Sequence, residues 1–294
     1  MGTPLKPVTQ EQVAASRDSL PAFPRVIEDV LITLDDPDAN LNLLVSHVAR
    51  DPVLAGRIFS QANVAATRTR RDSAVRDLYT ATSLIGLARL RQTTIMTSLA
   101  GFLKGALPAG LSPGFWEHSS AAGVCAQQVA AYAHQPTDAA LIAGLMHDVG
   151  QLWMCRFEPE TFSAAWRAAA TRKMTIVAAE QEFFGVDHTI IGAWLAETWG
   201  LPHPIVEAIR RHHAPDAALS EPLVPVVHVA EVLSNALEVS DRGGARVSYI
   251  SAECCKLLGL TWDDSTNALF GRIDAVSQYV ATYFKSPDGE ENAG

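Results

Sequence analysis

The sequence has few cysteines, no excess of basic charge and no long apolar run, and each absence excludes a class of protein. Its 294 residues include four cysteines, none of them in a CxxC pair, which argues against a disulfide framework and a zinc ribbon. The longest apolar stretch, Ala139 to Met146, is far shorter than the ~20 residues that span a bilayer. Residues 1–12 contain no apolar signal core. We therefore expect a soluble, cytoplasmic protein without a membrane partner.

Positive charge is scarce overall but locally concentrated. The chain has 23 Lys and Arg against 32 Asp and Glu, a formal net charge of −9, which disfavours a nucleic-acid partner. Between Arg50 and Arg91, however, eight arginines accompany three aspartates. Arginine forks bind carboxylate and phosphate groups, and solvated loop charge is the alternative interpretation. The candidate partner-binding residues in this stretch are Arg68, Arg70, Arg71 and Arg76.

Sustained two-residue alternation is absent, and this argues against β-strands. Apolar residues instead recur at spacings of three and four, as in the segment 26–31, which is the period of an amphipathic helix. Proline and glycine divide the chain into segments of about 10–18 residues. The pattern predicts an all-α protein.

A connector rich in glycine and proline, Gly105 to Gly114 (GALPAGLSPG), predicts a boundary between two helical lobes. We assign residues 20–105 to an N-terminal lobe and residues 106–284 to a C-terminal lobe. Residues 1–19 are expected to form an N-terminal extension, and the polar residues 285–294 a tail that frays.

The C-terminal lobe holds the side chains that could carry chemistry. They are His118, the doublet His147-Asp148, His188 and the pair His212-His213. Imidazole together with carboxylate suits zinc, iron, nickel or manganese. Adjacent residues on a helix point about 100° apart. His147 and Asp148 can therefore reach one ion only near a helix end or at a helix crossing.

Asp148 is the most informative of these residues. It follows the apolar run IAGLM, where an unpaired carboxylate would be expensive to bury. A metal ion, a histidinium or a helix-capping role would each compensate it. A single histidine in an apolar helix is more often a hydrogen-bonded core or surface residue than a metal ligand. The residue pattern alone therefore does not decide whether a metal, a histidinium or a capping role compensates Asp148.

The histidine and aspartate pattern resembles the HD superfamily of metal-dependent phosphohydrolases. Longer segments closely resemble the HD-related output domain (HDOD) family: FPRVIEDVLITLDDPDANLNLLVSHVARDPVLAGRIFSQAN, AVRDLYTATSLIGLARLRQTTI and FGVDHTIIGAWLAETWGLPHPIVEAIRRHHAP. The resemblance runs from about Leu20 to Phe284. It implies a helical lobe peculiar to output domains packed on an HD-like helical lobe. It also implies a bacterial signalling protein without robust phosphohydrolase activity.

The resemblance further implies a metal-ligand set and a defective substrate clamp. The residues that match ligand positions are His118, His147, Asp148, His188, His212 and His213, with Glu231 near the position of a closing aspartate. Active HD-GYP phosphodiesterases resemble HDxGK after the doublet, whereas this chain has Gln151, which supplies no positive charge for a substrate phosphate. The GYP segment is absent, and Ala214-Pro215-Asp216-Ala217 follows the paired histidines.

Two functions are consistent with these features. The leading interpretation is a stand-alone signalling output or adaptor domain, non-catalytic, that acts on signalling proteins or nucleotide-containing partners. The alternative is a phosphohydrolase that acts on a nucleotide or cyclic dinucleotide and depends on Fe, Mn, Ni or Zn. The retained ligand set favours the alternative, and the missing lysine and GYP segment favour the leading interpretation.

Overall fold

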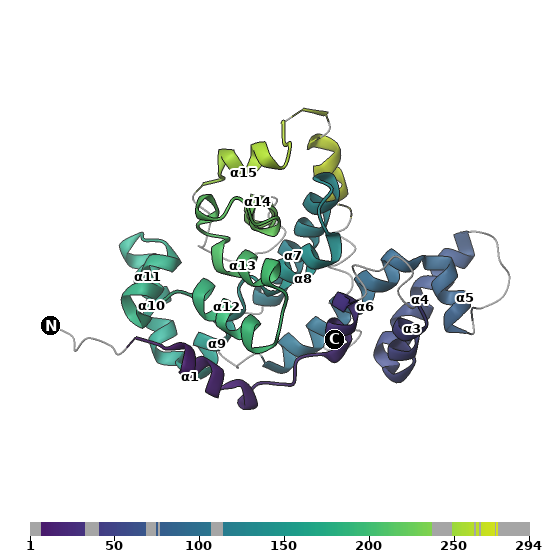
Figure 1. Ribbon diagram of the computed structural model, residues 1–294, viewed down its shortest axis with the longest axis horizontal. Coiled ribbons are helices and arrows are strands. Elements are labelled where there is room, and N and C mark those ends of the chain that lie inside the picture. Colours follow the sequence, from purple (N-terminus) through teal and green to yellow (C-terminus); the bar gives the residue numbers. More distant parts are fainter. Residues whose placement is uncertain are drawn as a thin grey trace, which may run out of the picture. The chain divides into compact units, whose positions relative to one another are not determined.

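The structure is a computed structural model (Figure 1), in which residues 7–32, 41–68, 75, 77–106, 114–236, 249–261, 263–264, 266–273 and 275 are described. All regular elements within these ranges are helices. The all-α class expected from the apolar periodicity is therefore confirmed. No helix of the described ranges combines the length and apolarity needed to cross a bilayer.

The chain divides into two compact units. The smaller unit contains residues 21–105, and the larger contains the residues described up to Leu20 together with those from Ala106 onward. The larger unit is thus built from two separate stretches of sequence.

The smaller unit is a cluster of helices with an apolar interior. Its helices are α2 (Arg25–Ile32), α3 (Leu41–Arg50), α4 (Pro52–Arg68), α5 (Leu78–Ile85) and α6 (Leu87–Ala106), the last of which ends at the unit boundary. Helices α3, α4 and α5 pack side by side (Figure 1). The Asp77 carboxylate accepts the N–H of Thr80 at the start of α5 (2.8 Å), which is a typical N-cap. Gly86, with φ of 81°, ends that helix.

Residues 266–273 of the larger unit are helical, and this unit also contains the remaining labelled helices. They are α1 (Gln10–Ala15), a 3₁₀ turn η1 (Arg17–Ser19), α7 (Gly114–Tyr132), α8 (Thr137–Met146), α9 (Val149–Phe157), α10 (Pro159–Arg172), α11 (Ile176–Phe184), α12 (His188–Thr198), α13 (His203–Arg211), a second 3₁₀ turn η2 (Pro215–Ala217), α14 (Leu223–Ala236) and α15 (Ala252–Leu257). Helices α7, α8, α13 and α14 pack on one another, and α12 contacts both α9 and α13. This packing brings together the parts of the helices and turns that carry the histidines.

Glycines allow two of these helix pairs to approach closely. A Cβ atom on Gly144 of α8 would lie 2.8 Å from both Ala122 O and Gly123 Cα of α7. A Cβ atom on Gly150 of α9 would lie 2.0 Å from His188 O, at the start of α12. Side chains larger than hydrogen are excluded at these distances. The close approach sets the separation of α7 from α8 and of α9 from α12, and His118, Asp148 and His188 lie in or next to these helices.

The N-terminal residues pack on the larger unit, where α1 runs along α12 (Figure 1). The Trp153 indole N–H donates to Ser16 Oγ (2.7 Å). The Arg156 guanidinium donates to two backbone carbonyls, Ser19 O (3.1 Å) and Ala106 O (3.4 Å). Residues 7–20 are therefore part of this unit.

Candidate metal site

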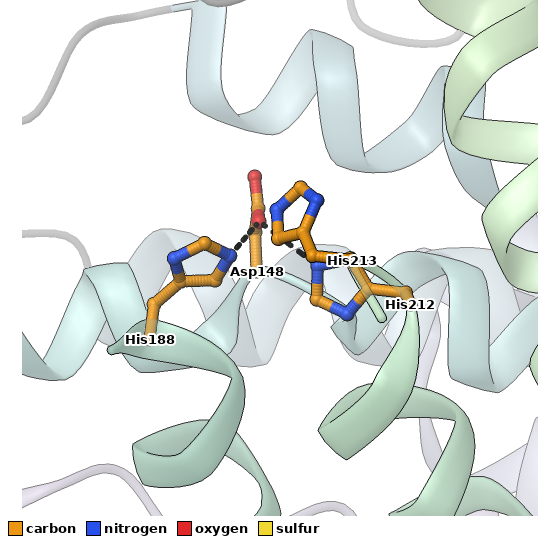
Figure 2. A group of neighbouring side chains, drawn as sticks. All are labelled: Asp148, His188, His212 and His213. Atoms are coloured by element: carbon orange, nitrogen blue, oxygen red, sulfur yellow. Dashed lines mark ion pairs between the residues drawn. The ribbon is translucent and has the colours of Figure 1, made fainter. Parts of the chain in front are cut away.

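Residues of α7, α12 and α14, and of the turns after α8 and α13, surround a single buried carboxylate. The seven residues proposed as ligands lie as follows: His118 in α7, His147 and Asp148 in the turn between α8 and α9, His188 at the first position of α12, His212 and His213 directly after α13, and Glu231 in α14. Figure 2 shows Asp148, His188, His212 and His213 facing one another. The doublet thus occupies a helix end, as its spacing in the sequence requires for a shared ion.

Asp148 is at the centre of the group. Its Oδ1 atom lies 3.3 Å from His188 Nε2, 3.5 Å from His147 Nε2 and 4.0 Å from His212 Nε2. Its Oδ2 atom lies 3.7 Å from His118 Nε2. Four nitrogen atoms therefore face one carboxylate from four directions.

The potential ligand atoms fall into three overlapping sets, within each of which all atoms lie within 4.8 Å of one another. These sets are Asp148 with His188, His212 and His213; His118 with His147 and Asp148; and His147 with His212 and Glu231. Glu231 approaches the group from the side of His213, whose Nδ1 lies 3.7 Å from Glu231 Oε2. All seven proposed ligands are thus brought together.

Hydrogen bonds at Nδ1 fix the orientation of three of the histidine rings. His147 Nδ1 lies 2.7 Å from Gly144 O, and His212 Nδ1 lies 2.8 Å from Ile209 O. A carbonyl oxygen can only accept, so each Nδ1 carries the hydrogen and each neutral ring presents its Nε2 lone pair. His188 Nδ1 donates to the Glu180 carboxylate (2.5 Å). These three Nε2 atoms are among the four nitrogen atoms that approach Asp148.

Local sequence places His188 at the start of its helix. The Asp187 side chain caps α12 by accepting the N–H of Thr189 (3.0 Å) and of Ile190 (3.4 Å). Glu180 Oε2 accepts the backbone N–H of His188 (2.9 Å) in addition to its ring N–H. The Glu180 carboxylate thus holds both the backbone and the ring of His188.

The site is almost closed to solvent. His147, His188, His212 and the supporting Glu180 are 0% exposed, and Asp148 is 3% exposed. Among the histidines that contact Asp148 or Glu231, His213 has the most exposed side chain, at 22%. Solvent approaches the cluster from the side of His213.

Burial and neighbouring charge separate the protonation states of the rings. Burial and the neighbouring histidines hold the pKa of His212 well below its usual value. Burial, with the charge of His188, lowers the pKa of His213 to about 3. Burial opposes protonation of His188 as well, but the Glu180 and Asp148 carboxylates outweigh it and raise its pKa to about 9. Without a metal, a protonated His188 therefore compensates Asp148, whose Oδ1 lies 3.3 Å from its Nε2.

The donor set fits a transition metal. The Nε2 atoms of His188 and His212 are buried and make no hydrogen bond within the described residues, although buried nitrogen atoms are normally satisfied. Histidine ligands of metals typically donate their other N–H to a carboxylate or backbone carbonyl, as Glu180, Gly144 and Ile209 accept here. A cation bound among these atoms would take the place of the proton on His188 Nε2.

Glu180 was not expected from the sequence. The sequence feature that could have indicated Glu180 is its position between Ile176 and Phe184. Residues four apart share a helix face, and this face is otherwise apolar. An acid on such a face implies a buried partner. Gln151, by contrast, lies where the doublet predicts it, in the first turn of α9, and is buried.

The side chains of the four arginines proposed for partner binding lie outside the described part of the chain. Arg70, Arg71 and Arg76 fall between the described ranges, and only the backbone of Arg68, the last residue of α4, is described. Partner binding by these residues stays a prediction.

Comparison with known proteins identifies the family. A model of the HDOD domain family matches residues 20–215. The chain belongs to the HDOD domain family. This match covers all of the proposed ligands except Glu231.

Solved structures share the fold of this HDOD protein. An HDOD domain protein of unknown function from Geobacter sulfurreducens aligns with a TM-score of 0.68 and 22% identity, over 93% of this chain and 95% of the other. A protein from Shewanella amazonensis SB2B, provisionally named a phosphohydrolase, aligns with a TM-score of 0.63 and 21% identity, over 90% and 93% of the two chains.

A protein of Treponema pallidum (strain Nichols), described as uncharacterized, is 25% identical over 227 residues. The match covers 75% of this HDOD protein and 43% of the Treponema protein. The chain therefore spans less than half the length of that relative.

Proposed function

We propose that this HDOD protein is a signalling output domain that binds a transition-metal ion in the Asp148 site and does not hydrolyse phosphodiesters efficiently. The observation that carries the proposal is that hydrogen bonds fix the ring orientation of three buried histidines. His147, His188 and His212 each have Nδ1 bound to a protein acceptor and Nε2 directed at Asp148.

This arrangement supports metal binding because the ligands are held before the metal arrives. Asp148, His188, His212 and His213 would hold the ion, and His147 belongs to two further sets that share Asp148 or His212 with them. Zinc, iron, nickel and manganese are the ions suited to nitrogen and carboxylate ligands. When bound, such an ion supplies a Lewis acid and a link between the helices that carry its ligands.

Two features argue against efficient turnover. The ring donors around Asp148 are almost fully buried, with His213 only partly exposed, whereas a phosphodiester must reach the reacting atoms. In addition, the charge developing on phosphate in a transition state needs a preorganised positive group. Active HD-GYP phosphodiesterases resemble the pattern HDxGK, and this chain has the neutral Gln151 at the position of the lysine.

The phosphohydrolase alternative is favoured by one observation, the convergence of all seven ligand candidates. An output domain that had lost all use of the site would be free to lose these side chains. We therefore keep hydrolysis of a nucleotide or cyclic dinucleotide as the competing function, to be tested on the same preparation.

Metal analysis and a hydrolysis assay separate the two functions. Wild-type protein purified without chelator should contain a bound transition metal, and His147→Ala and Asp148→Ala should lose it. His203→Ala is the matched control, because this exposed histidine pairs with Glu221 (3.4 Å) away from the ligand set. Protein that takes up none of Zn²⁺, Fe²⁺, Ni²⁺ or Mn²⁺ would contradict the metal site.

Turnover decides the remaining question. Cyclic dinucleotides and model phosphodiesters should be hydrolysed far more slowly than about 1 s⁻¹, the low end of the usual range for enzymes. Turnover near that rate that requires metal and disappears in Asp148→Ala would overturn the non-catalytic assignment in favour of a phosphohydrolase.

The proposed partners are signalling proteins or nucleotide-containing molecules. The arginine cluster of the N-terminal lobe is the proposed contact, since guanidinium groups bind carboxylate and phosphate in a salt-dependent manner. Combined replacement of Arg68, Arg70 and Arg71 by alanine should reduce partner recovery in a pull-down at low salt. Undiminished recovery would remove these residues from the interface.

A further inference from the structure

His228 is a buried histidine that lies next to the metal site without facing Asp148. It belongs to α14, three residues before Glu231, and is 1% exposed. Its Nδ1 atom lies 2.7 Å from the backbone carbonyl oxygen of His212. The backbone N–H of Ser251 donates to its Nε2 atom (3.0 Å).

These two hydrogen bonds determine the tautomer of His228. A carbonyl only accepts and a backbone N–H only donates, so Nδ1 carries the hydrogen and Nε2 carries the lone pair. Burial lowers the pKa of His228, which agrees with a neutral ring. His228 therefore joins the main chain of His212 to the main chain of Ser251.

Ser251 extends this connection to the turn that follows the paired histidines. Its Oγ atom donates to Asp216 Oδ1 (2.6 Å) and accepts the N–H of Cys254 (3.2 Å), which caps α15. Asp216 lies in η2, four residues after His212. Hydrogen bonds thus link His212 through His228 and Ser251 to Asp216. Because His212 and Asp216 lie at the two ends of the turn after α13, this network holds the turn at both ends.

We propose that His228 is a positioning residue of the metal site, which acts by holding the main chain of His212. The inference rests on the proposed function, because it requires that a metal binds there. The ring of His212 is fixed at Nδ1 by Ile209 O, and its backbone is fixed by His228. Together the two bonds leave Nε2 of His212 on the side of Asp148.

Residues 249–257 thereby help to hold the proposed metal site in place, through Ser251. Asp216, His228 and Ser251 all follow residue 215, where the HDOD family match ends. Coupling free energies are reciprocal. If the His228 network favours metal binding, metal binding must stabilise the His228 network.

Two amide variants separate the two bonds of His228. In His228→Asn the side-chain N–H₂ takes the place of Nδ1–H and keeps the bond to His212 O, while the acceptor for Ser251 is lost. In His228→Gln the amide oxygen takes the place of Nε2 and keeps the bond to Ser251, while the donor to His212 is lost. Tyr249→Phe is the matched control, because the Tyr249 ring lies 5.5 Å from the His228 ring and neither bond uses its hydroxyl.

Co²⁺ is the probe, because its visible absorption reports both binding and coordination geometry. We expect His228→Gln to bind Co²⁺ about 10–100-fold more weakly than wild type, the usual effect of losing a group that orients a ligand, with an altered spectrum. His228→Asn should lose less affinity, and Tyr249→Phe should match wild type. A helical circular-dichroism spectrum establishes that each variant is folded.

The outcomes distinguish this inference from the proposed function. Wild-type protein without Co²⁺ binding would overturn both. A folded His228→Gln that is less stable but binds Co²⁺ with wild-type affinity and spectrum would overturn the inference alone, because His228 would then only support the fold. The inference alone would also be overturned if His228→Asn loses as much affinity as His228→Gln.

A measurement on the wild-type protein covers the case in which His228→Gln does not fold. Addition of Zn²⁺ should slow hydrogen exchange of the Ser251 amide, because metal binding stabilises the network to which this N–H donates. Unchanged exchange of this amide on saturation with Zn²⁺ would overturn the inference.

Discussion

Replacing Glu180 with glutamine removes the negative charge beside His188 at almost unchanged side-chain size. The carboxylate accepts both the backbone N–H and the ring N–H of His188, and with Asp148 it raises the pKa of His188 to about 9 against the effect of burial. Glutamine has the same size and no charge. We expect the pKa of His188 to fall in Glu180→Gln, because burial then dominates.

The expected effect on metal binding depends on pH. At pH 7 a group with a pKa of about 9 is almost fully protonated, so a metal must displace the Nε2 proton. The apparent affinity of the wild-type protein should therefore gain about tenfold per pH unit from this group between pH 7 and 9. In Glu180→Gln that gain should disappear, and affinity at pH 9 should fall by about 10–100-fold because the orienting bond is weakened.

Titration calorimetry with Zn²⁺ in buffers of different ionisation enthalpy counts the protons released. At pH 7 the wild-type protein should release about one proton more per metal than Glu180→Gln. Glu182→Gln is the control, since this residue is half exposed and pairs with Arg172 on the surface. Equal proton release from the wild-type protein and Glu180→Gln would refute the reasoning.

Two further predictions concern stability. Gly150→Ala should lower the free energy of unfolding in urea by at least about 1–3 kcal/mol, because its Cβ would lie 2.0 Å from His188 O, whereas Gly271→Ala meets no atom within 4 Å; equal stability of the two variants would contradict the close contact of α9 and α12. The metal-free protein should also lose thermal stability as the pH falls below about 6.5, because His212 and His213 have lowered pKa values in the folded state and the unfolded chain then binds more protons. A melting temperature that is constant from pH 7 to 5 would show that these rings are not held neutral by the fold.

The sequence predicts the helices and the candidate ligands for different reasons. Helices follow from local periodicity, which depends on neighbouring residues alone. The ligands follow from residue type and from the resemblance to a family, and the clustering around Asp148 brings them together. Neither local periodicity nor residue type and family resemblance requires knowledge of tertiary packing, such as the contact between α9 and α12.

The supporting residues depend on that tertiary packing. Glu180 reaches His188 across the turn between α11 and α12, and His228 reaches His212 from a different helix. A histidine that orients a ligand and a histidine that is a ligand have the same side chain, and only the position of the ring distinguishes them. Sequence periodicity marks both as buried and cannot assign either role.

The Arg156 guanidinium has a consequence for how the chain can be divided. It binds Ser19 O and Ala106 O, which are the backbone groups next to the two points where the chain leaves the larger unit and re-enters it. Residues 21–105 are therefore an insertion between neighbouring anchor points, and such insertions are tolerated where the ends of a segment lie close together. A short glycine linker in their place would close only a small loop, at a small cost in entropy. The larger unit should consequently be separable from the lobe inserted into it, with the surroundings of Asp148 left unchanged.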